Sequence, residues 1–317
     1  MRGARTVILL ATLLLIGCQD LGLTNSDPEK LVARHADAHS RFLEIEGVRL
    51  HIRDEGEGPA IVLLHGVLAS LHTWDGWTDD LTDRYRVIRI DIPPFGLSDP
   101  LPDGDYHGPA MTRVLHAVLD QLKVESAVFV GNSLGGYYAA YFAAHAPDRV
   151  RALALISPAA YPQPLPWMLR LGATPVIGKG FEIAMPRITV QWALQRLYAK
   201  PERIEAATVE RYFELNRAPN LRAAAREVMR QMVAHSDREP VWIRRIEQPT
   251  LLLWGEADHW VPPYQAERWQ ADLVDSRFIL YPDAGHVPME EIPARTVADF
   301  RAFLAAITSG GDIGSVE

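Results

Sequence analysis

The sequence Phe129-Val-Gly-Asn-Ser-Leu-Gly-Gly136 decides the fold of this chain, because it places a serine between an apolar run and a helical pattern. The spacing G-x-S-x-G is typical of a sharp turn from a strand into a helix. Such a turn strains the serine backbone, and glycines flank it because side chains there would clash with the strand and the helix. We therefore expect the Ser133 hydroxyl to be exposed at the carboxyl end of a strand, beside the free amide of Leu134.

Short apolar runs with polar or glycine-containing boundaries recur on both sides of this turn. They lie at 61–64, 87–90, 127–130, 152–156, 250–254 and 277–281. Such runs are typical of strands buried on both faces of a parallel sheet. Helical patterns at 111–122 and 134–146 alternate with them, and residues 42–53 alternate as an antiparallel hairpin around Gly47. The sequence therefore predicts an α/β protein with a doubly wound, mostly parallel sheet.

One long interval interrupts this alternation. Residues 159–245 contain no convincing strand pattern, whereas Pro201 opens a helical pattern that continues to Leu215, and another apolar stripe begins at Leu221. We interpret the interval as a helical cap inserted into the sheet domain. The predicted bounds are 41–158 and 246–308 for the core, 159–245 for the cap and 309–317 for a flexible tail.

A serine hydroxyl needs a base within hydrogen-bond reach to act as a nucleophile, and imidazole titrates in the suitable range. His286 follows the last predicted strand, and His259 also lies near a strand end. We favour His286, because Asp258 supplies the carboxylate that orients the base and the adjacent side chains of Asp258 and His259 normally point apart. The second amide donor to a developing oxyanion is expected at Val67, in the loop after an earlier strand.

These segments together resemble the α/β-hydrolase superfamily over roughly residues 42–307. They are His65-Gly66, the turn at 131–136, Gly255-x-x-Asp258 and Gly285-His286. The resemblance implies a serine hydrolase in which Ser133 is the nucleophile, Asp258 the acid and His286 the base, with the amides of Val67 and Leu134 as the oxyanion hole. It implies no cofactor and no metal.

Two details refine the resemblance. The turn at 91–98 resembles the D-x-P-G-x-G-x-S turn of the family, with Pro94 at the position of its first glycine. His65 is expected to stabilise its own turn rather than to move protons. Apolar side chains are available above the site in the predicted cap, namely Trp167, Met168, Leu169, Phe181, Ile183, Met185, Ile188 and Trp192.

This supply of apolar side chains favours a carboxylic ester with an apolar acyl group or ring as the small-molecule substrate, cleaved through an acyl-enzyme. A second hypothesis is a carbon-carbon bond hydrolase of the meta-cleavage-product group, which the pair Asn132-Ser133 also resembles. Those enzymes usually carry Trp after the catalytic histidine, where this chain has Val287. A third is a non-catalytic receptor that keeps the fold.

Composition excludes other classes. The chain has 317 residues, of which 48% are hydrophobic and 23% charged, with a net charge of -8 and one cysteine. This is the composition of a folded globular protein. An acidic chain without runs of Lys or Arg lacks the basic surface that nucleic acid binding requires, so we expect no nucleic acid partner.

The amino terminus has the pattern of a secretory signal, in which two arginines precede an apolar run at 7–16 that is too short to span a bilayer. Leu15-Ile16-Gly17-Cys18 resembles the lipobox of bacterial lipoprotein signals. The resemblance implies that residues 1–17 are removed and that Cys18 carries acyl chains such as palmitate. The protein would then be exported to the bacterial cell envelope and anchored to a membrane.

Residues 18–40 are polar with little apolar periodicity, and we expect them to form a flexible tether between the lipid and the fold. His35 and His39 would share one face of a helix, as metal ligands do. No third ligand lies nearby in the sequence, so the prediction for this segment remains a solvated spacer.

Overall fold

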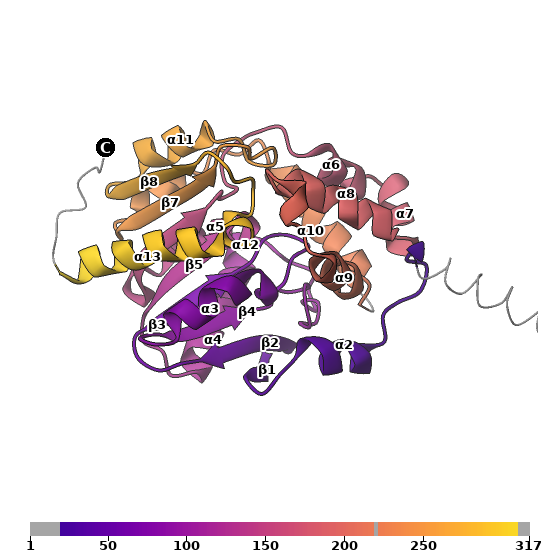
Figure 1. Cartoon of the computed structure of the whole chain (residues 1–317), viewed down its shortest axis with the longest axis horizontal. Helices are drawn as coiled ribbons and strands as arrows, with labels where there is room; N and C mark the ends of the chain where they lie inside the picture. Colours follow the sequence, from indigo (N-terminus) through magenta and orange to yellow (C-terminus); the bar gives the residue numbers. More distant parts are fainter. Residues whose placement is uncertain (1–19, 219–220, 310–317) are drawn as a thin grey trace, which may run out of the picture.

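Eight strands form a single sheet within residues 20–218 and 221–309, which the computed structural model describes (Figure 1). The strands are β1 Ser40–Ile45, β2 Val48–Glu55, β3 Ala60–Leu64, β4 Arg86–Ile90, β5 Ala127–Asn132, β6 Val150–Ile156, β7 Thr250–Gly255 and β8 Ser276–Tyr281. Their order is β1-β2-β4-β3-β5-β6-β7-β8. The pairs β1/β2 and β2/β4 are antiparallel and the others are parallel. The predicted fold class is confirmed.

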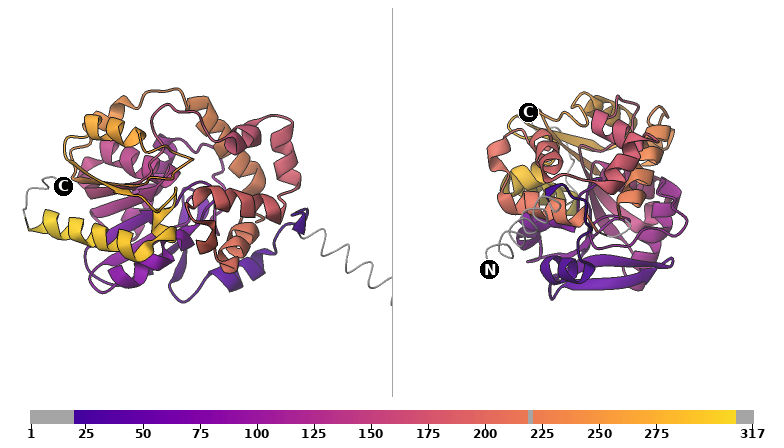
Figure 2. Two further views of the ribbon diagram at one scale, coloured as in Figure 1. Left: turned by 45° about the horizontal axis from the view of Figure 1, so that its top comes forward. Right: turned by 90° about the vertical axis from the view of Figure 1, so that its right-hand side faces the viewer.

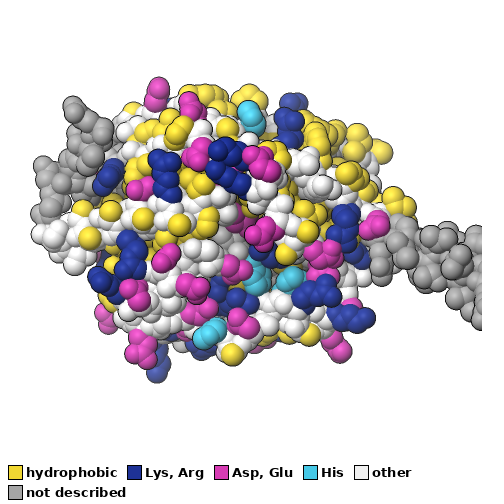
Figure 3. Space-filling view, in the orientation of Figure 1, with side chains coloured by type: hydrophobic (Ala, Val, Ile, Leu, Met, Phe, Trp, Pro, Cys, Tyr) yellow, Lys and Arg dark blue, Asp and Glu magenta, His cyan; other side chains and the backbone are white. Residues whose placement is uncertain are grey.

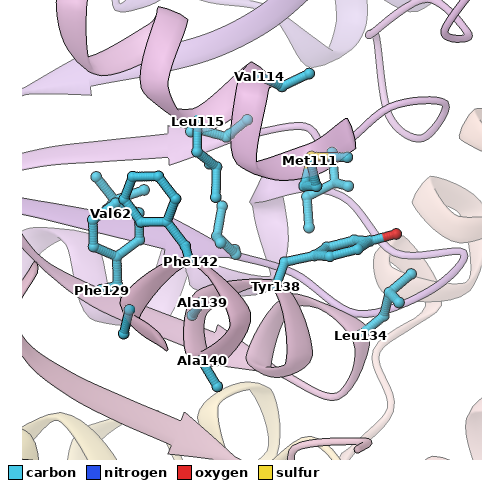
Figure 4. Close-up of a cluster of buried hydrophobic side chains, with 14 of the residues drawn as sticks. Val62, Met111, Val114, Leu115, Phe129, Leu134, Tyr138, Ala139, Ala140 and Phe142 are labelled. Carbon is cyan, nitrogen blue, oxygen red and sulfur yellow. The ribbon is translucent and has the colours of Figure 1, made fainter. Parts of the chain in front are cut away.

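Helices cover both faces of this sheet because its strands are apolar on both sides. The core helices are α3 Asp75–Leu81, α4 Gly108–Gln121, α5 Leu134–His145, α11 Gln265–Asp272, α12 Pro288–Glu291 and α13 Pro293–Thr308. In β3, Ile61 and Leu63 belong to the apolar cluster that contains Trp77 of α3. Val62 of the same strand lies in the opposite cluster with Phe142 of α5 (Figure 4). This alternation follows from the two-residue period of a strand.

The cap between β6 and β7 consists of helices joined by loops, with no strand among its described residues. Its helices are α6 Trp167–Ala173, α7 Ile177–Ile183, α8 Arg187–Leu197, α9 Ala206–Leu215 and α10 Leu221–His235. They lie together beyond one end of the strands (Figure 2). One predicted boundary is wrong, because Pro201 begins a short 3-10 turn and the helix starts only at Ala206. Residues 204 and 205 between them have extended backbone.

The segment expected to be a flexible tether is instead packed against the cap. Within residues 18–40, α2 Pro28–His35 is capped by Asp27, and Leu31 is buried. Arg217 donates to the Thr24 carbonyl oxygen at 2.9 Å, and Arg222 donates to the Gly22 carbonyl oxygen at 2.8 Å. Both guanidinium groups are buried in the cap and need acceptors, which the polar segment supplies. Composition alone does not reveal this requirement.

The two histidines of this segment are separated in the structure. Nε2 of His35 lies 3.1 Å from Glu214 of α9, whereas His39 is exposed. No group of three side chains suited to holding a metal occurs among the described residues.

The predicted signal at 1–17 and the lipidation site Cys18 lie outside the described residues, as do all but the first residue of the predicted tail at 309–317. In the part of the chain that the structure describes, no helix combines the length and the apolar character needed to cross a bilayer.

Arg222→Ala should release the packed amino-terminal segment from the cap. The variant loses three hydrogen bonds, to Gly22, Ile183 and Asn25, so the segment should open more often. We expect trypsin to cleave after Lys30 at least about tenfold faster than in the parent chain, as measured by mass spectrometry of the fragments.

The matched control for this experiment is Arg230→Ala. Arg230 lies on the same helix, α10, but its side chain is largely exposed and, among the described residues, bonds to Glu227 alone. Equal cleavage rates in the two variants would contradict the role of Arg222.

Candidate active site

Ser133 lies in the turn between β5 and α5 with φ of 53° and ψ of -114°. Few residues other than glycine adopt this backbone conformation, and its strain costs about 1–3 kcal/mol. The turn is possible because glycines stand two residues before and two residues after Ser133. A Cβ on Gly135 would lie 2.3 Å from the Leu64 carbonyl oxygen, and a Cβ on Gly131 would lie 2.3 Å from the Gly135 carbonyl oxygen. The close packing of α5 on the sheet therefore holds Ser133 at the carboxyl edge.

Asp258 and His286 meet at the same edge. Asp258 follows β7, and His286 lies in the loop after β8. Nδ1 of His286 donates to Oδ2 of Asp258 at 2.8 Å, and both side chains are buried. The other carboxylate oxygen accepts the backbone amides of Trp260 and Val261 at 2.8 and 2.9 Å. The carboxylate is thus fixed on both sides and orients the imidazole.

Ser133 and His286 line one common pocket. Within the described residues, neither the Ser133 hydroxyl nor Nε2 of His286 has a hydrogen-bond partner. Both groups are therefore free to bond to a substrate in the pocket. Hydrogen bonds between catalytic groups are often long in the free protein and shorten when a substrate is bound. His259, the alternative base, is exposed and does not line this pocket.

Asn132 holds the histidine loop against the serine turn. Its Nδ2 donates to the His286 carbonyl oxygen at 3.0 Å and to the Ile156 carbonyl oxygen at 3.1 Å. The His286 amide in turn donates to the Leu197 carbonyl oxygen of α8 at 2.7 Å. The backbone of the candidate base is therefore attached to both the core and the cap.

Glu291 is a positioning residue that sequence reasoning missed. Its buried carboxylate accepts the Gly285 amide at 2.8 Å, beside His286, and the amides of Ala199 and Lys200 at 3.0 and 2.8 Å. Arg203 of the cap donates to it at 3.2 Å. No local pattern in the sequence indicates this role, because Glu291 bonds to Ala199 and Lys200, which lie 92 and 91 residues away in the chain.

The two expected amide donors lie next to the serine turn. Val67 lines the same pocket as Ser133, and Leu134 is the first residue of α5. Neither amide donates to an acceptor among the described residues. Leu134 is not among the residues that line this pocket, and it lines a neighbouring cavity of about 560 Å³.

His65 stabilises its turn, as the sequence predicts. Its Nδ1 lies 2.7 Å from the Gly66 carbonyl oxygen, which accepts the proton, and its Nε2 accepts the Ile92 amide at 2.9 Å. Complete burial lowers the pKa of His65, so the neutral imidazole that this pattern requires is favoured.

Asp91 closes the turn that follows β4 and supports the loop leading away from Val67. It accepts the amides of Leu71 and Leu97 and the Nδ1 proton of His51, at 2.7, 2.8 and 2.7 Å. Burial acts to raise the pKa of Asp91, but the hydrogen bond and charge of His51 outweigh burial and lower it to about 2. The replacement of the family glycine by Pro94 therefore leaves this turn closed.

The pocket beneath the cap has a volume of about 110 Å³ and is mainly apolar. The cap contributes Met168, Leu169, Phe181, Met185, Leu194 and Met229, and Trp260 stacks on His286 from the core side. Other apolar cap residues named from the sequence, such as Trp167, Ile183 and Ile188, point outward and are exposed. The lining contains no Lys, Arg, Asp or Glu among the described residues.

Sheet order, serine turn and inserted cap together define a class of protein. The chain belongs to the alpha/beta hydrolase fold family, whose model matches residues 59–293.

Particular relatives support this assignment. A 2-hydroxy-6-oxononadienedioate/2-hydroxy-6-oxononatrienedioate hydrolase of Klebsiella pneumoniae is 29% identical over 265 residues, which cover 78% of this chain and 90% of that protein. The structure of a thermophilic esterase from Thermogutta terrifontis superposes with a TM-score of 0.70 at 27% identity, over 85% of this chain and 99% of that one. A membrane phospholipase A has the same fold, with a TM-score of 0.74 at 23% identity over 97% and 99% of the two chains. The chain is a hydrolase of this family.

Asp91→Asn should lower the free energy of unfolding at neutral pH, by an amount that the parent protein itself loses in acid. A carboxyl group whose pKa is 3.8 when unfolded and about 2 when folded contributes about 2 kcal/mol above pH 4 and loses it as the pH falls from about 4 to about 2. We expect the free energy of unfolding in urea to differ between parent and variant by about this amount at pH 7, and the difference to shrink toward pH 2. Parallel stability curves over this pH range would contradict the assignment.

Proposed function

We propose that the chain is a serine hydrolase that cleaves carboxylic esters of apolar acyl or aromatic groups. The observation that carries this proposal is the 2.8 Å hydrogen bond between His286 and Asp258 at the edge of an apolar pocket that also contains Ser133. In this proposal Ser133 is the nucleophile, His286 the base and Asp258 the acid. The amides of Val67 and Leu134 stabilise the oxyanion.

The reaction proceeds in two stages. Ser133 Oγ attacks the ester carbonyl carbon while Nε2 of His286 takes the hydroxyl proton, and the Asp258 carboxylate stabilises the imidazolium. The tetrahedral intermediate collapses when His286 returns the proton to the departing alkoxide, which releases the alcohol and leaves an acyl-enzyme. Water, deprotonated by the same imidazole, then releases the acid and restores Ser133.

The lining of the pocket favours an ester over a dicarboxylate substrate. The Klebsiella pneumoniae relative is named for substrates that end in dioate and so carry two carboxylates. This pocket offers no cation to compensate such charges in its described lining. A carbon-carbon bond hydrolase acting on these dianions is therefore the weaker alternative.

The volume of the pocket limits the acyl group. A cavity of about 110 Å³ is smaller than the roughly 150 Å³ cavity that encloses one benzene molecule. We infer that the enclosed group is a short acyl chain, and that a ring or a long chain must extend partly out of the pocket.

Ser133→Ala should lower turnover of p-nitrophenyl butyrate by about 10⁴ to 10⁶-fold and leave the circular dichroism spectrum unchanged. The hydroxyl that forms the acyl-enzyme is lost, while alanine fits the same turn. A fluorophosphonate probe should label the parent chain and not the variant. Retention of most ester hydrolysis would overturn the assignment of Ser133, and an unlabelled parent would favour a non-catalytic receptor.

A substrate series tests the class of substrate in the same preparation. We expect kcat/KM to be highest for the acetate and butyrate p-nitrophenyl esters and to fall at least about tenfold for the palmitate, because the pocket is short. A dienoic ring-fission dicarboxylate should react far more slowly. Preference for that substrate would instead support the carbon-carbon bond hydrolase.

We also propose that the protein is exported and carries a lipid on Cys18, on the strength of the signal pattern in the first 18 residues. Mass spectrometry of the protein from a bacterial envelope fraction should find an amino terminus at Cys18 with attached acyl chains. An unmodified Cys18 in the mature chain would contradict this proposal.

A further inference from the structure

The outer face of the cap exposes large apolar side chains that the proposed reaction does not use. We call this surface the cap patch, and it comprises Trp167 at 51% exposure, Val176 at 82%, Ile177 at 52%, Ile183 at 66% and Ile188 at 69%. Hydrophobic atoms gather over this end of the molecule (Figure 3). Exposed apolar side chains that gather in one region are typical of binding surfaces, whereas single ones scattered over a surface are ordinary.

The described amino-terminal residues continue the cap patch. Arg222 donates from one nitrogen to the carbonyl oxygens of both Gly22 and Ile183, at 2.8 and 3.0 Å, which brings these two segments together. Leu21 and Leu23 on either side of Gly22 are 51% and 45% exposed. The patch thus extends from the cap onto the first residues of the described chain.

The first described residue, Asp20, lies at the edge of this patch. Asp20 bonds to Arg187 at the start of α8, next to Ile188. The 19 residues that precede Asp20 include the apolar run at 7–16 and Cys18. Any attachment of these residues to a membrane therefore holds the cap patch close to the same membrane.

The charges beside the patch favour a lipid surface. Arg187 pairs with Asp20 and Glu210, and Glu182 pairs with Arg226, so these charges compensate one another. Arg170 and Lys179 are exposed and make no ion pair within the described residues. Exposed apolar groups with basic neighbours are typical of surfaces that lie on anionic bilayers.

We propose that the cap patch docks on the surface of a lipid bilayer, with its apolar side chains among the acyl chains and Arg170 and Lys179 at the headgroups. The same layer lines the pocket on its inner side, through Met168 of α6, Phe181 of α7 and Met185 in the loop between α7 and α8. Docking therefore places the pocket directly above the bilayer, where it meets esters dissolved in the membrane. This last consequence rests on the proposed esterase function, whereas the docking itself does not.

A site-specific fluorophore tests the contact directly. In the full chain with Cys18→Ser, Ile177→Cys carries a polarity-sensitive dye in one preparation and Val274→Cys carries it in a second. Val274 is 76% exposed and lies between α11 and β8, away from the cap, so it is a matched control. Both preparations share the amino terminus, so attachment through that segment affects them equally.

With vesicles of phosphatidylglycerol and phosphatidylethanolamine, we expect the dye at 177 to shift to the blue and to be quenched by spin-labelled lipids. The dye at 274 should remain in water. Absence of both effects at 177 would overturn the proposal even if the protein binds the vesicles. A blue shift at 177 without vesicles that grows with protein concentration would also overturn it, because it would identify a surface for self-association.

An activity measurement with matched acyl groups separates docking from catalysis. Val176→Asp with Ile183→Asp should lower hydrolysis of hexadecyl butyrate carried in vesicles at least about tenfold, because two apolar side chains that would insert into the bilayer are replaced by charged ones. Hydrolysis of soluble p-nitrophenyl butyrate should stay within about twofold, since neither residue lines the pocket. Val274→Asp should change neither rate. Equal rates on vesicles for parent and cap variant would contradict docking, whereas failure of the parent on both esters would contradict the esterase function and leave the dye result to decide docking.

Discussion

The close approach of α5 to the end of β3 is the contact on which the candidate site depends. Gly135 has no room for a side chain, because a Cβ there would lie 2.3 Å from the Leu64 carbonyl oxygen. This contact sets the start of α5, and with it Ser133 and the Leu134 amide, beside the loop that carries Val67. One backbone constraint thus gathers the candidate nucleophile and the two candidate amide donors at a single edge of the sheet.

The cap does more than cover the pocket, because it also holds the candidate base. The His286 amide bonds to Leu197 of α8, and Glu291 joins the neighbouring Gly285 to residues 199 and 200. Displacement of α8 would therefore move the imidazole relative to Ser133. The outer side of the same cap bears the cap patch. One layer of helices therefore carries both the proposed membrane-docking surface and the backbone contacts that position His286.

Sequence reasoning succeeded where local pattern and local chemistry coincide. Apolar runs located the parallel strands, and the glycines around Ser133 indicated the turn, because both features act over a few neighbouring residues. It missed the role of Asn132 toward His286, whose carbonyl oxygen is 154 residues distant in the chain. It was wrong about the described part of the predicted tether, residues 20–40, because the acceptors that Arg217 and Arg222 require are visible only when the cap is folded.

The sequence by itself determined the α/β sheet, the inserted helices and the chemical groups available at the carboxyl edge, since periodicity and turn residues encode burial and local geometry. Only the tertiary structure decided that Asp258 bonds to His286 while His259 faces solvent. It also decided which apolar cap residues line the pocket and which form the cap patch, and that the described pocket lining carries no charged side chain. These outcomes depend on packing between segments far apart in the chain, which no local pattern specifies.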